Sequence, residues 1–246
     1  MSKEAPRMRM FAGPNGSGKS TLKTIIRPDI VGMYINPDEI EKNISNNGNI
    51  DLNYYDISAS TDEFLNFFDK SSLSKKTHYL TTENNIKIND NKIIFSNIEN
   101  NSYIASIIAD FIRQKLIDNL RSFTFETVMS FSDKIDLFNK ARHMGYRTYL
   151  YYVATEDPTI NISRVKHRVS TGGHPVPEDK IISRYHRSLE LLMDAVKVSN
   201  RAYIFDNSGC EQIWLAEITD GHMLEMKTDN IPGWFKTSIL DKLNRI

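Results

Sequence analysis

Residues 13–20 combine three glycines with a lysine and a hydroxyl side chain in an order that predicts phosphate binding. They read G-P-N-G-S-G-K-S, which fits the pattern G-x-x-x-x-G-K-[ST], and they follow the apolar run Met8 to Ala12. Glycines let the backbone turn tightly enough for successive N–H groups to point at one anion. Lys19 would reach the terminal phosphates of a nucleotide, and the Ser20 hydroxyl would ligate Mg²⁺. The alternative is a glycine-rich turn that binds nothing, and the flanking strand and helix signals argue against it. The loop residues expected to hold a nucleotide are Gly13, Pro14, Asn15, Gly16, Ser17, Gly18, Lys19, Ser20 and Thr21.

Polar side chains that would contact a phosphate acceptor follow two further predicted strands. Asp38 comes after the apolar run 31–35, and as a base it would accept the proton of an acceptor hydroxyl. The alternative for Asp38 is an N-terminal helix cap, a position that aspartate favours. Glu126 and Thr127 end another β-rich run and would grip a polar acceptor or hold a Mg²⁺-bound water, unless they only begin a solvated loop. Asn36 is expected to contact the same acceptor.

A basic helix-loop-helix segment is suited to neutralise the charge of a transferred phosphate. Arg164 and Arg168 lie four residues apart on one predicted helix face, and Arg184 and Arg187 lie three apart on the next helix. The loop between them, residues 171–177, is rich in glycine and proline, as a closing lid requires. The alternative is two solvated helices with ordinary surface arginines and a loop histidine that only ties down the turn. The residues assigned to the lid are Arg168, Arg184 and Arg187 as catalytic groups and His174 as a substrate contact.

Alternating strand and helix signals predict how these residues are brought together. Strands are expected over 8–12, 31–35, 121–127, 146–153 and 202–205, with helices over 19–26, 102–120, 135–143, 158–169 and 178–198. This order predicts an α/β fold of the P-loop NTPase and kinase type, with a mainly parallel sheet and helices on both faces. Ligands then bind at the carboxyl ends of the strands, where Asp206 and Asn207 also fall; Asn207 is assigned to the nucleotide.

Residues 43–101 shift toward asparagine, lysine and aspartate and interrupt this alternation. A helical patch over 62–68 and a hairpin of 86–88 with 93–95 are expected within them. We interpret the chain, 1–246, as one domain with an inserted α/β segment.

Composition narrows the classes of protein that remain. The 246 residues carry 31 basic and 31 acidic side chains, so no overall charge recruits nucleic acid or a membrane surface. No stretch approaches the length of a membrane span. Cys210 is the single cysteine, which fits a reducing compartment, and we expect a cytoplasmic protein.

The ordered motifs resemble the zeta-toxin-like P-loop kinases. The resemblance covers about residues 8–43 and 103–208. It rests on the segments 13–21, 35–39, 122–127, 145–147, 168–177 and 184–188. It implies an ATP- and Mg²⁺-dependent phosphotransferase with an alcohol group as acceptor, a hydroxyl of UDP-N-acetylglucosamine in the known members, several of which are toxins held inactive by an antitoxin. In this chain Asp38 matches the catalytic base, Lys19 the phosphate-binding lysine, and Glu126 with Thr127 the acceptor-binding pair.

Two departures leave the acceptor open. Residues 43–101 have no counterpart in the compact members of the family, and the lid around Gly172 and Gly173 differs from that of the toxins. An antibiotic or another small metabolite is therefore a second acceptor class. A third hypothesis is a nucleotide-dependent switch that binds a partner through residues 43–101, although a switch needs neither the lid nor Asp38.

Overall fold

The computed structural model describes residues 4–77, 85–96 and 102–243, and the chain divides into two compact units. The first unit comprises Met1–Gly32 and Thr124–Ile246, and the second comprises Met33–Phe123. The predicted insertion, 43–101, lies inside the second unit, which also includes residues 33–42 and 102–123. The interpretation of the chain as one domain stays a prediction.

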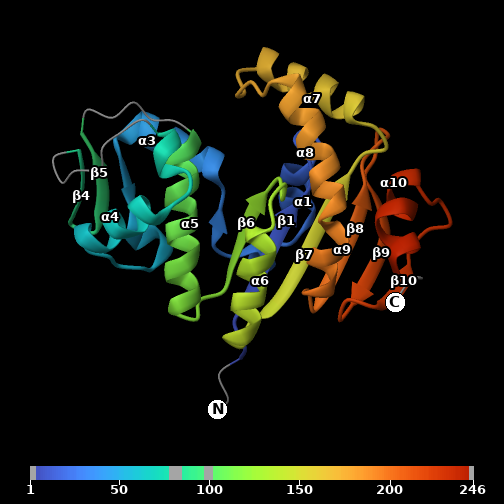
Figure 1. Ribbon diagram of the computed structural model, residues 1–246, viewed down its shortest axis with the longest axis horizontal. Coiled ribbons are helices and arrows are strands. Elements are labelled where there is room, and N and C mark those ends of the chain that lie inside the picture. Colours follow the sequence, from blue (N-terminus) through green and yellow to red (C-terminus); the bar gives the residue numbers. More distant parts are fainter. Residues whose placement is uncertain (1–3, 78–84, 97–101, 244–246) are drawn as a thin grey trace. The chain divides into compact units, whose positions relative to one another are not determined.

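A largely parallel sheet forms the centre of the first unit (Figure 1). Its strands are β1 (Arg7–Ala12), β6 (Phe123–Thr127), β7 (Arg147–Ala154), β8 (Arg201–Asp206), β9 (Ile213–Thr219) and β10 (Met223–Met226), in the spatial order β10-β9-β8-β7-β1-β6. The strand β7 pairs in parallel with both β1 and β8, while β9 runs antiparallel to β8 and β10. In this register Tyr151 of β7 lies between Phe11 of β1 and Tyr203 of β8. The α/β fold with a mainly parallel sheet is therefore confirmed.

Helices alternate with most of the strands of the first unit along the chain. They are α1 (Lys19–Ile25), α2 (Pro28–Val31), α6 (Asp133–His143), α7 (Pro158–Ser170), α8 (Glu178–Glu190), α9 (Leu192–Lys197), α10 (Gly233–Phe235), a π-helical turn (Lys236–Leu240) and α11 (Asp241–Leu243). The helix α1 packs against β1 and β7, and α6 packs against β7. The start of α7 is set by sequence, because Pro158 suits a first helical position and Asp157 accepts from the N–H of Thr159 at 2.7 Å.

Two predicted boundaries are wrong. Val31 was expected to begin a strand, but it ends α2, because Pro28 is already preset for a first helical turn and starts a new helix. The strand β2 is limited to Tyr34–Ile35. The helix expected over 178–198 is interrupted at Leu191, which separates α8 from α9.

A large part of the core of the first unit lies on the face of its sheet that α8 and α9 cover. Met10, Leu150, Tyr152 and Ile204 are fully buried there, and each such side chain contributes about 1.5–3 kcal/mol relative to an exposed one. In Figure 1, α8 and α9 lie over β7 and β8, and the hydroxyl of Tyr152 lies 3.0 Å from Ser188 Oγ of α8.

The second unit combines helices with a small antiparallel sheet. Its elements are β2, α3 (Pro37–Asn47), β3 (Asn49–Asp51), a 3₁₀ turn (Leu52–Tyr55), α4 (Thr61–Lys70), a 3₁₀ turn (Ser74–Lys76), β4 (Ile86–Asn89), β5 (Lys92–Phe95) and α5 (Ser102–Asp118), with the sheet order β3-β5-β4. The predicted hairpin is confirmed: Asp90 and Asn91 both have positive φ, as a two-residue type I′ turn requires. Phe64 packs edge-on against Phe111, joining α4 to α5.

Candidate functional site

The loop between β1 and α1 is held against the end of β7 with little free space. Gly13 has φ +143°, and a Cβ added there would lie 2.0 Å from the carbonyl oxygen of Val153. Gly18 has φ +100°, and its Cβ would lie 2.2 Å from Nδ2 of Asn207. Both positions therefore require glycine for conformation and for space.

Two asparagines bind the loop from opposite parts of the chain. Asn161 of α7 donates from Nδ2 to the carbonyl of Asn15 at 2.6 Å, and Asn207, just after β8, donates from Nδ2 to the carbonyl of Ser17 at 2.8 Å. Asn161 is fully buried and accepts a hydrogen bond from the hydroxyl of Thr155. The sequence assigns Asn207 to the nucleotide, and in the structure its amide binds the loop itself. Sequence reasoning missed Asn161, because it belongs to no motif and lies 146 positions from Asn15.

Lys19 is buried and turns back over the loop that precedes it. Its Nζ donates to the carbonyls of Gly13 at 2.9 Å and Pro14 at 3.0 Å, and it lies 4.0 Å from Oε1 of Glu126. The ammonium group therefore lies against the carbonyls of the glycine-rich turn, with the carboxylate of Glu126 from the end of β6 beside it. The structure brings Lys19 and Glu126 together, as the placement of both at strand ends predicted.

The side chains of the loop fit an anionic ligand. Among the residues that the structure describes, none hydrogen-bonds to Ser17 Oγ, although this hydroxyl is fully buried. A buried hydroxyl without a partner costs about 1–3 kcal/mol, so a phosphate oxygen would be a favourable acceptor for it. The hydroxyl-bearing Ser20 is exposed at the second position of α1, where a metal ion accompanying the phosphates could reach it.

Thr127 has a local structural role that the sequence did not reveal. Its Oγ1 accepts from the N–H of Met129 at 3.0 Å, and Met129 has φ +53°. The hydroxyl thus stabilises the turn after β6 and fixes the direction in which Glu126 leaves the strand.

The predicted lid lies between α7 and α8. Arg168 donates from Nη2 to the carbonyl of His174 at 3.0 Å, so the arginine itself shapes the glycine-rich loop. Arg164 donates to the carbonyls of Asn207 at 2.7 Å and Gly209 at 3.1 Å. Arg164 therefore fastens α7 to the segment after β8, whereas Arg168 and His174 are exposed.

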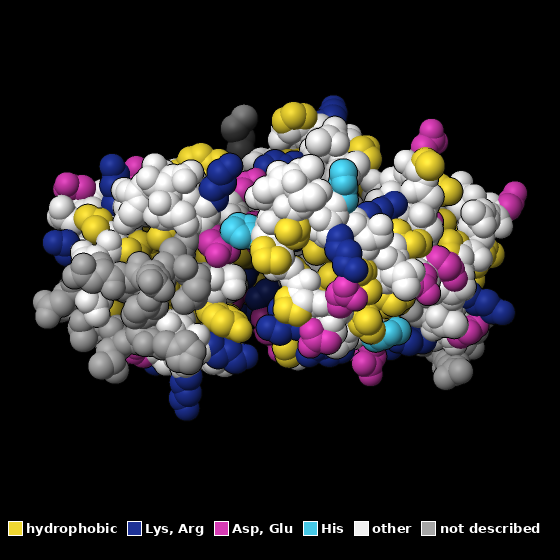
Figure 2. Space-filling view, turned by 90° about the horizontal axis from the view of Figure 1, so that it is seen from above, with side chains coloured by type: hydrophobic (Ala, Val, Ile, Leu, Met, Phe, Trp, Pro, Cys, Tyr) yellow, Lys and Arg dark blue, Asp and Glu magenta, His cyan; other side chains and the backbone are white. Residues whose placement is uncertain are grey.

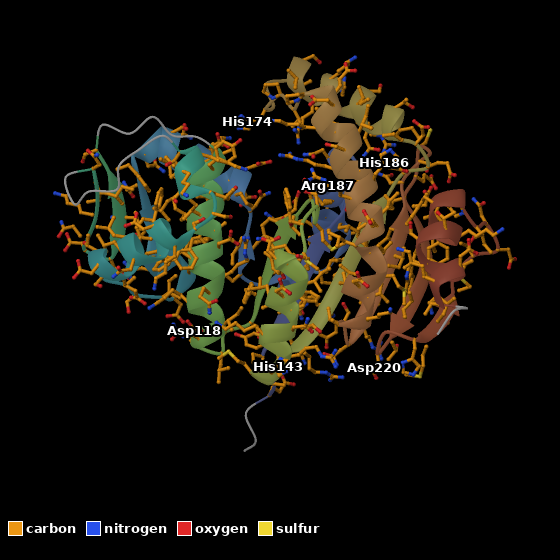
Figure 3. The ribbon with its side chains drawn as sticks, in the orientation of Figure 1. Asp118, His143, His174, His186, Arg187 and Asp220 are labelled. Carbon is orange, nitrogen blue, oxygen red and sulfur yellow. The ribbon has the colours of Figure 1, made fainter. Side chains whose placement is uncertain are left out.

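Arg184 and Arg187 lie on a helix that is anchored firmly to the sheet. Tyr185 donates to the carbonyl of Thr155 at 2.6 Å. Burial is the main reason that the pKa of Tyr185 is raised above its usual value, so the phenol stays a donor. Arg184 and Arg187 are half-buried beside this anchor, and Arg187 lies 4.7 Å above the ring of Phe131. Figure 3 shows Arg187 and His186 on different sides of α8.

Asp38 and Asn36 lie at the start of α3 in the second unit. Asn36 is the N-cap, and its Oδ1 accepts from the N–H of Asp38 at 2.9 Å. The alternative interpretation of Asp38 as the helix cap is therefore wrong, since Asn36 already fills that position. Asp38 is exposed in the first helical turn and its carboxylate is not used for capping.

Asp206 is a structural residue. Its Oδ1 accepts from Trp234 Nε1 at 2.8 Å and from Ser208 Oγ at 2.7 Å. This buried carboxylate fixes the segment after β10 to the end of β8, and it directs Asn207 toward the loop.

Charges of both signs are interspersed on the surface that Figure 2 displays, consistent with the zero formal net charge. Within the described ranges, none of the helices has the length and apolar character needed to cross a membrane.

Together, the fold and this loop define an α/β protein of the P-loop class. A family model described as Zeta toxin matches residues 96–219, which are half of the chain. The match begins directly after β5 and ends with the last residue of β9, so it does not include the loop of residues 13–20. The chain belongs to the Zeta toxin family.

Solved structures show the same fold at low sequence identity. A crystal structure of AvrRxo1-ORF1:-ORF2 with ATP has a TM-score of 0.59 and 13% identity, covering 97% of this chain and 63% of that chain. A second, of AvrRxo1-ORF1:AvrRxo1-ORF2 with sulphate ions, has a TM-score of 0.58 and 14% identity, covering 91% and 61%. An uncharacterized protein of Haemophilus influenzae (strain ATCC 51907 / DSM 11121 / KW20 / Rd) is 33% identical over 63 residues, which are 26% of this chain and 45% of that protein. The chain thus spans less than two thirds of each of these relatives.

Proposed function

We propose that this protein is a kinase that transfers the γ-phosphate of ATP to a hydroxyl of a small polar acceptor. The observation that carries the proposal is the loop of residues 13–20, in which the buried Lys19 ammonium and the buried hydroxyl of Ser17, which has no partner among the described residues, are both donors for phosphate. Family membership supports it, because the zeta-toxin-like kinases that the sequence resembles phosphorylate a hydroxyl. The AvrRxo1-ORF1:-ORF2 crystal structure with ATP supports the choice of nucleotide.

Bound ATP and Mg²⁺ would supply the transferable phosphoryl group and part of its charge neutralisation. The chain would hold them through the backbone and side chains of residues 13–21, with Ser20 as the metal ligand and Asn207 supporting the loop. Lys19 would move from the carbonyls of Gly13 and Pro14 to the terminal phosphates. Glu126, 4.0 Å away, keeps its carboxylate beside that ammonium.

The remaining roles follow the chemistry of each side chain. Asp38 would accept the proton of the attacking hydroxyl. Arg168, Arg184 and Arg187 would stabilise charge on the transferred group. The acceptor would be bound by Asn36, Glu126, Thr127 and His174.

The acceptor that we favour is a sugar nucleotide such as UDP-N-acetylglucosamine, with toxicity controlled by an antitoxin. The two-component AvrRxo1-ORF1:-ORF2 structures support a protein partner. We place the protein in the cytoplasm, because its single cysteine, Cys210, is exposed and fits a reducing compartment.

Mass spectrometry of the purified protein incubated with ATP, Mg²⁺ and UDP-N-acetylglucosamine tests the proposal. A singly phosphorylated sugar nucleotide, formed by the wild type and absent with Lys19→Met, is the expected product. Phosphate transfer to an aminoglycoside or another hydroxyl compound alone would keep the kinase and replace the acceptor. ATP hydrolysis that responds to a partner protein, with no phosphorylated acceptor in a metabolite extract, would refute the kinase and leave a nucleotide-dependent switch.

A further inference from the structure

The sheet of the first unit has one covered face and one partly open face. Side chains alternate along β7 and β8, with Leu150, Tyr152, Ala202 and Ile204 fully buried on the covered face. On the opposite face Val153 is fully buried, the tyrosines and Phe205 of these strands are half-buried, and Trp214 of β9 is 40% exposed. Parallel sheets are normally covered on both faces, so an open face is unusual here. We call it the aromatic sheet face, and its rings are Tyr149, Tyr151, Tyr203, Phe205 and Trp214.

The rings of this face stand upright and cover one another. Tyr151 and Tyr203 stack with ring centroids 4.8 Å apart and an angle of 24° between their planes. Phe205 and Trp214 stack at 6.4 Å and 26°. Because neighbouring rings occupy their flat faces, they present edges outward and offer a base little to stack on. This geometry argues against single-stranded nucleic acid and suits a protein partner, since tyrosine, tryptophan and arginine dominate the cores of protein interfaces.

The charge of the aromatic sheet face is positive. Its cations are Arg7, Arg9, Arg147, Arg201 and Lys227, and the carboxylates beside them are Glu4, Glu217 and Glu225. Arg7, Arg201 and Lys227 pair with those carboxylates, which leaves the charges of Arg9 and Arg147 in excess. Arg147 is exposed, whereas Arg9 is only 7% exposed. Arg9 lies 5.5 Å from the centroid of Tyr149, and Lys227 lies 4.9 Å from that of Trp214.

We propose that the aromatic sheet face binds an amphipathic, acidic α-helix of a partner protein. A helix is the element that covers the faces of α/β sheets, and its apolar stripe would rest on the exposed edges of the rings. Acidic residues along its flanks would complement the exposed Arg147. A second copy of this chain is a poor occupant, because a twofold contact would bring the same cations together. This surface uses none of the residues assigned to the nucleotide or the acceptor.

Site-specific photo-crosslinking in living cells of the native host tests the proposal. A benzophenone amino acid replaces Trp214, which is 40% exposed, in the full-length protein. The same probe at Tyr54, which is 72% exposed and lies in the second unit, is the matched control. We expect an adduct from position 214 only, mapping to a partner segment with apolar residues at helical spacing and acidic residues beside them.

The crosslinked segment is then synthesised and its affinity for the purified protein is measured by calorimetry. We expect Trp214→Ala and Arg147→Glu each to weaken binding at least about tenfold, and added salt to weaken binding further. Arg147 is exposed, so its variant leaves the packing of the rings intact, and ATP binding checks the fold of both variants. An adduct only to a second copy, to nucleic acid or to a basic segment would overturn the proposal. So would no adduct above the Tyr54 control, or an affinity that neither substitution changes.

Discussion

The side-chain amide of Asn161 donates to the carbonyl of Asn15 at 2.6 Å, and this single bond joins helix α7 to the glycine-rich loop. The same helix carries Arg164, which is bonded to the carbonyl of Asn207, and Asn207 is bonded to the carbonyl of Ser17. The loop is thus fixed from both sides by groups that α7 holds in place. A helix that ends in the proposed lid therefore also positions the proposed phosphate site.

Asn161→Ala should weaken ATP binding as well as the fold. It removes the donor to Asn15 and the acceptor of Thr155, so the free energy of unfolding should fall by about 2 kcal/mol. ATP affinity should fall about tenfold, because the loop loses about one hydrogen bond that holds it in the ATP-binding conformation. Chemical denaturation and calorimetry measure the two effects. Asn200→Ala is the matched control, because Asn200 accepts from Thr148 and should lower stability alone; equal ATP affinities for the two variants would contradict the positioning role.

Gly13→Ala and Gly48→Ala should differ widely in their cost, because Gly13 has both less space and a backbone conformation that an L residue tolerates less. Both glycines have positive φ, but a Cβ on Gly48 meets nothing within 4 Å, whereas on Gly13 it would lie 2.0 Å from the carbonyl of Val153. Gly48→Ala should therefore cost only the conformational penalty of about 1–2 kcal/mol. Gly13→Ala should lose far more stability and all ATP binding, because backbone atoms cannot move aside cheaply. Equal urea midpoints for the two variants would show that the loop is looser than its contacts imply.

Asp38→Asn should lower turnover by about 10²–10⁴-fold and leave ATP affinity unchanged, since it removes proton acceptance alone. Steady-state kinetics with the acceptor and nucleotide titrations measure the two quantities. Glu39→Gln is the matched control, because Glu39 is an exposed carboxylate in the same first turn of α3. A parallel loss of turnover in both variants would assign the effect to the helix and not to a base.

Arg168→Ala should reduce kcat and kcat/KM together by about 10²-fold, as expected when one charge-stabilising donor is lost from a transition state. Lys166→Ala provides the comparison, because Lys166 is a neighbouring cation whose partner is Glu178 on the surface. It should retain wild-type kinetics. If the Arg168 variant also retains wild-type kinetics, the guanidinium has only the structural role of binding the carbonyl of His174.

Tyr55 should make the protein sensitive to alkaline pH. Burial, followed by the nearby Tyr54 and Glu39, raises the pKa of Tyr55 to about 12. The unfolded chain loses this proton near pH 10 (about the value of a free tyrosine), so the stabilisation is complete below that pH and lost as pH rises toward 12. Denaturation at about pH 9 and about pH 11 should show a smaller loss for Tyr55→Phe than for the wild type. Identical losses would mean that the phenol titrates normally in the folded protein.

Part of the fold and of the site is readable from local sequence. The strand and helix alternation, the hairpin at Asp90 and Asn91, and the loop of residues 13–20 were all predicted, because periodicity and turn chemistry act over a few neighbouring residues. The meeting of Lys19 with Glu126 followed from one topological rule, that parallel strands place their carboxyl ends at one edge. The strands β9 and β10 were not predicted, although Ile213 and Trp214 mark the first of them.

What the sequence by itself determined is the class of fold and the phosphate chemistry of the loop, since a P-loop is a contiguous motif whose residues are already neighbours. The cap of α3 by Asn36 and the turn bond of Thr127 are contacts over two residues, which the structure showed but which are local. Only the tertiary structure decided that Asn161 supports the loop, because it lies 146 positions from Asn15. The open aromatic sheet face also required it, because Tyr151, Tyr203 and Trp214 come from three separate strands. The partners of these side chains are set by packing between distant segments, and that information is absent from any local pattern.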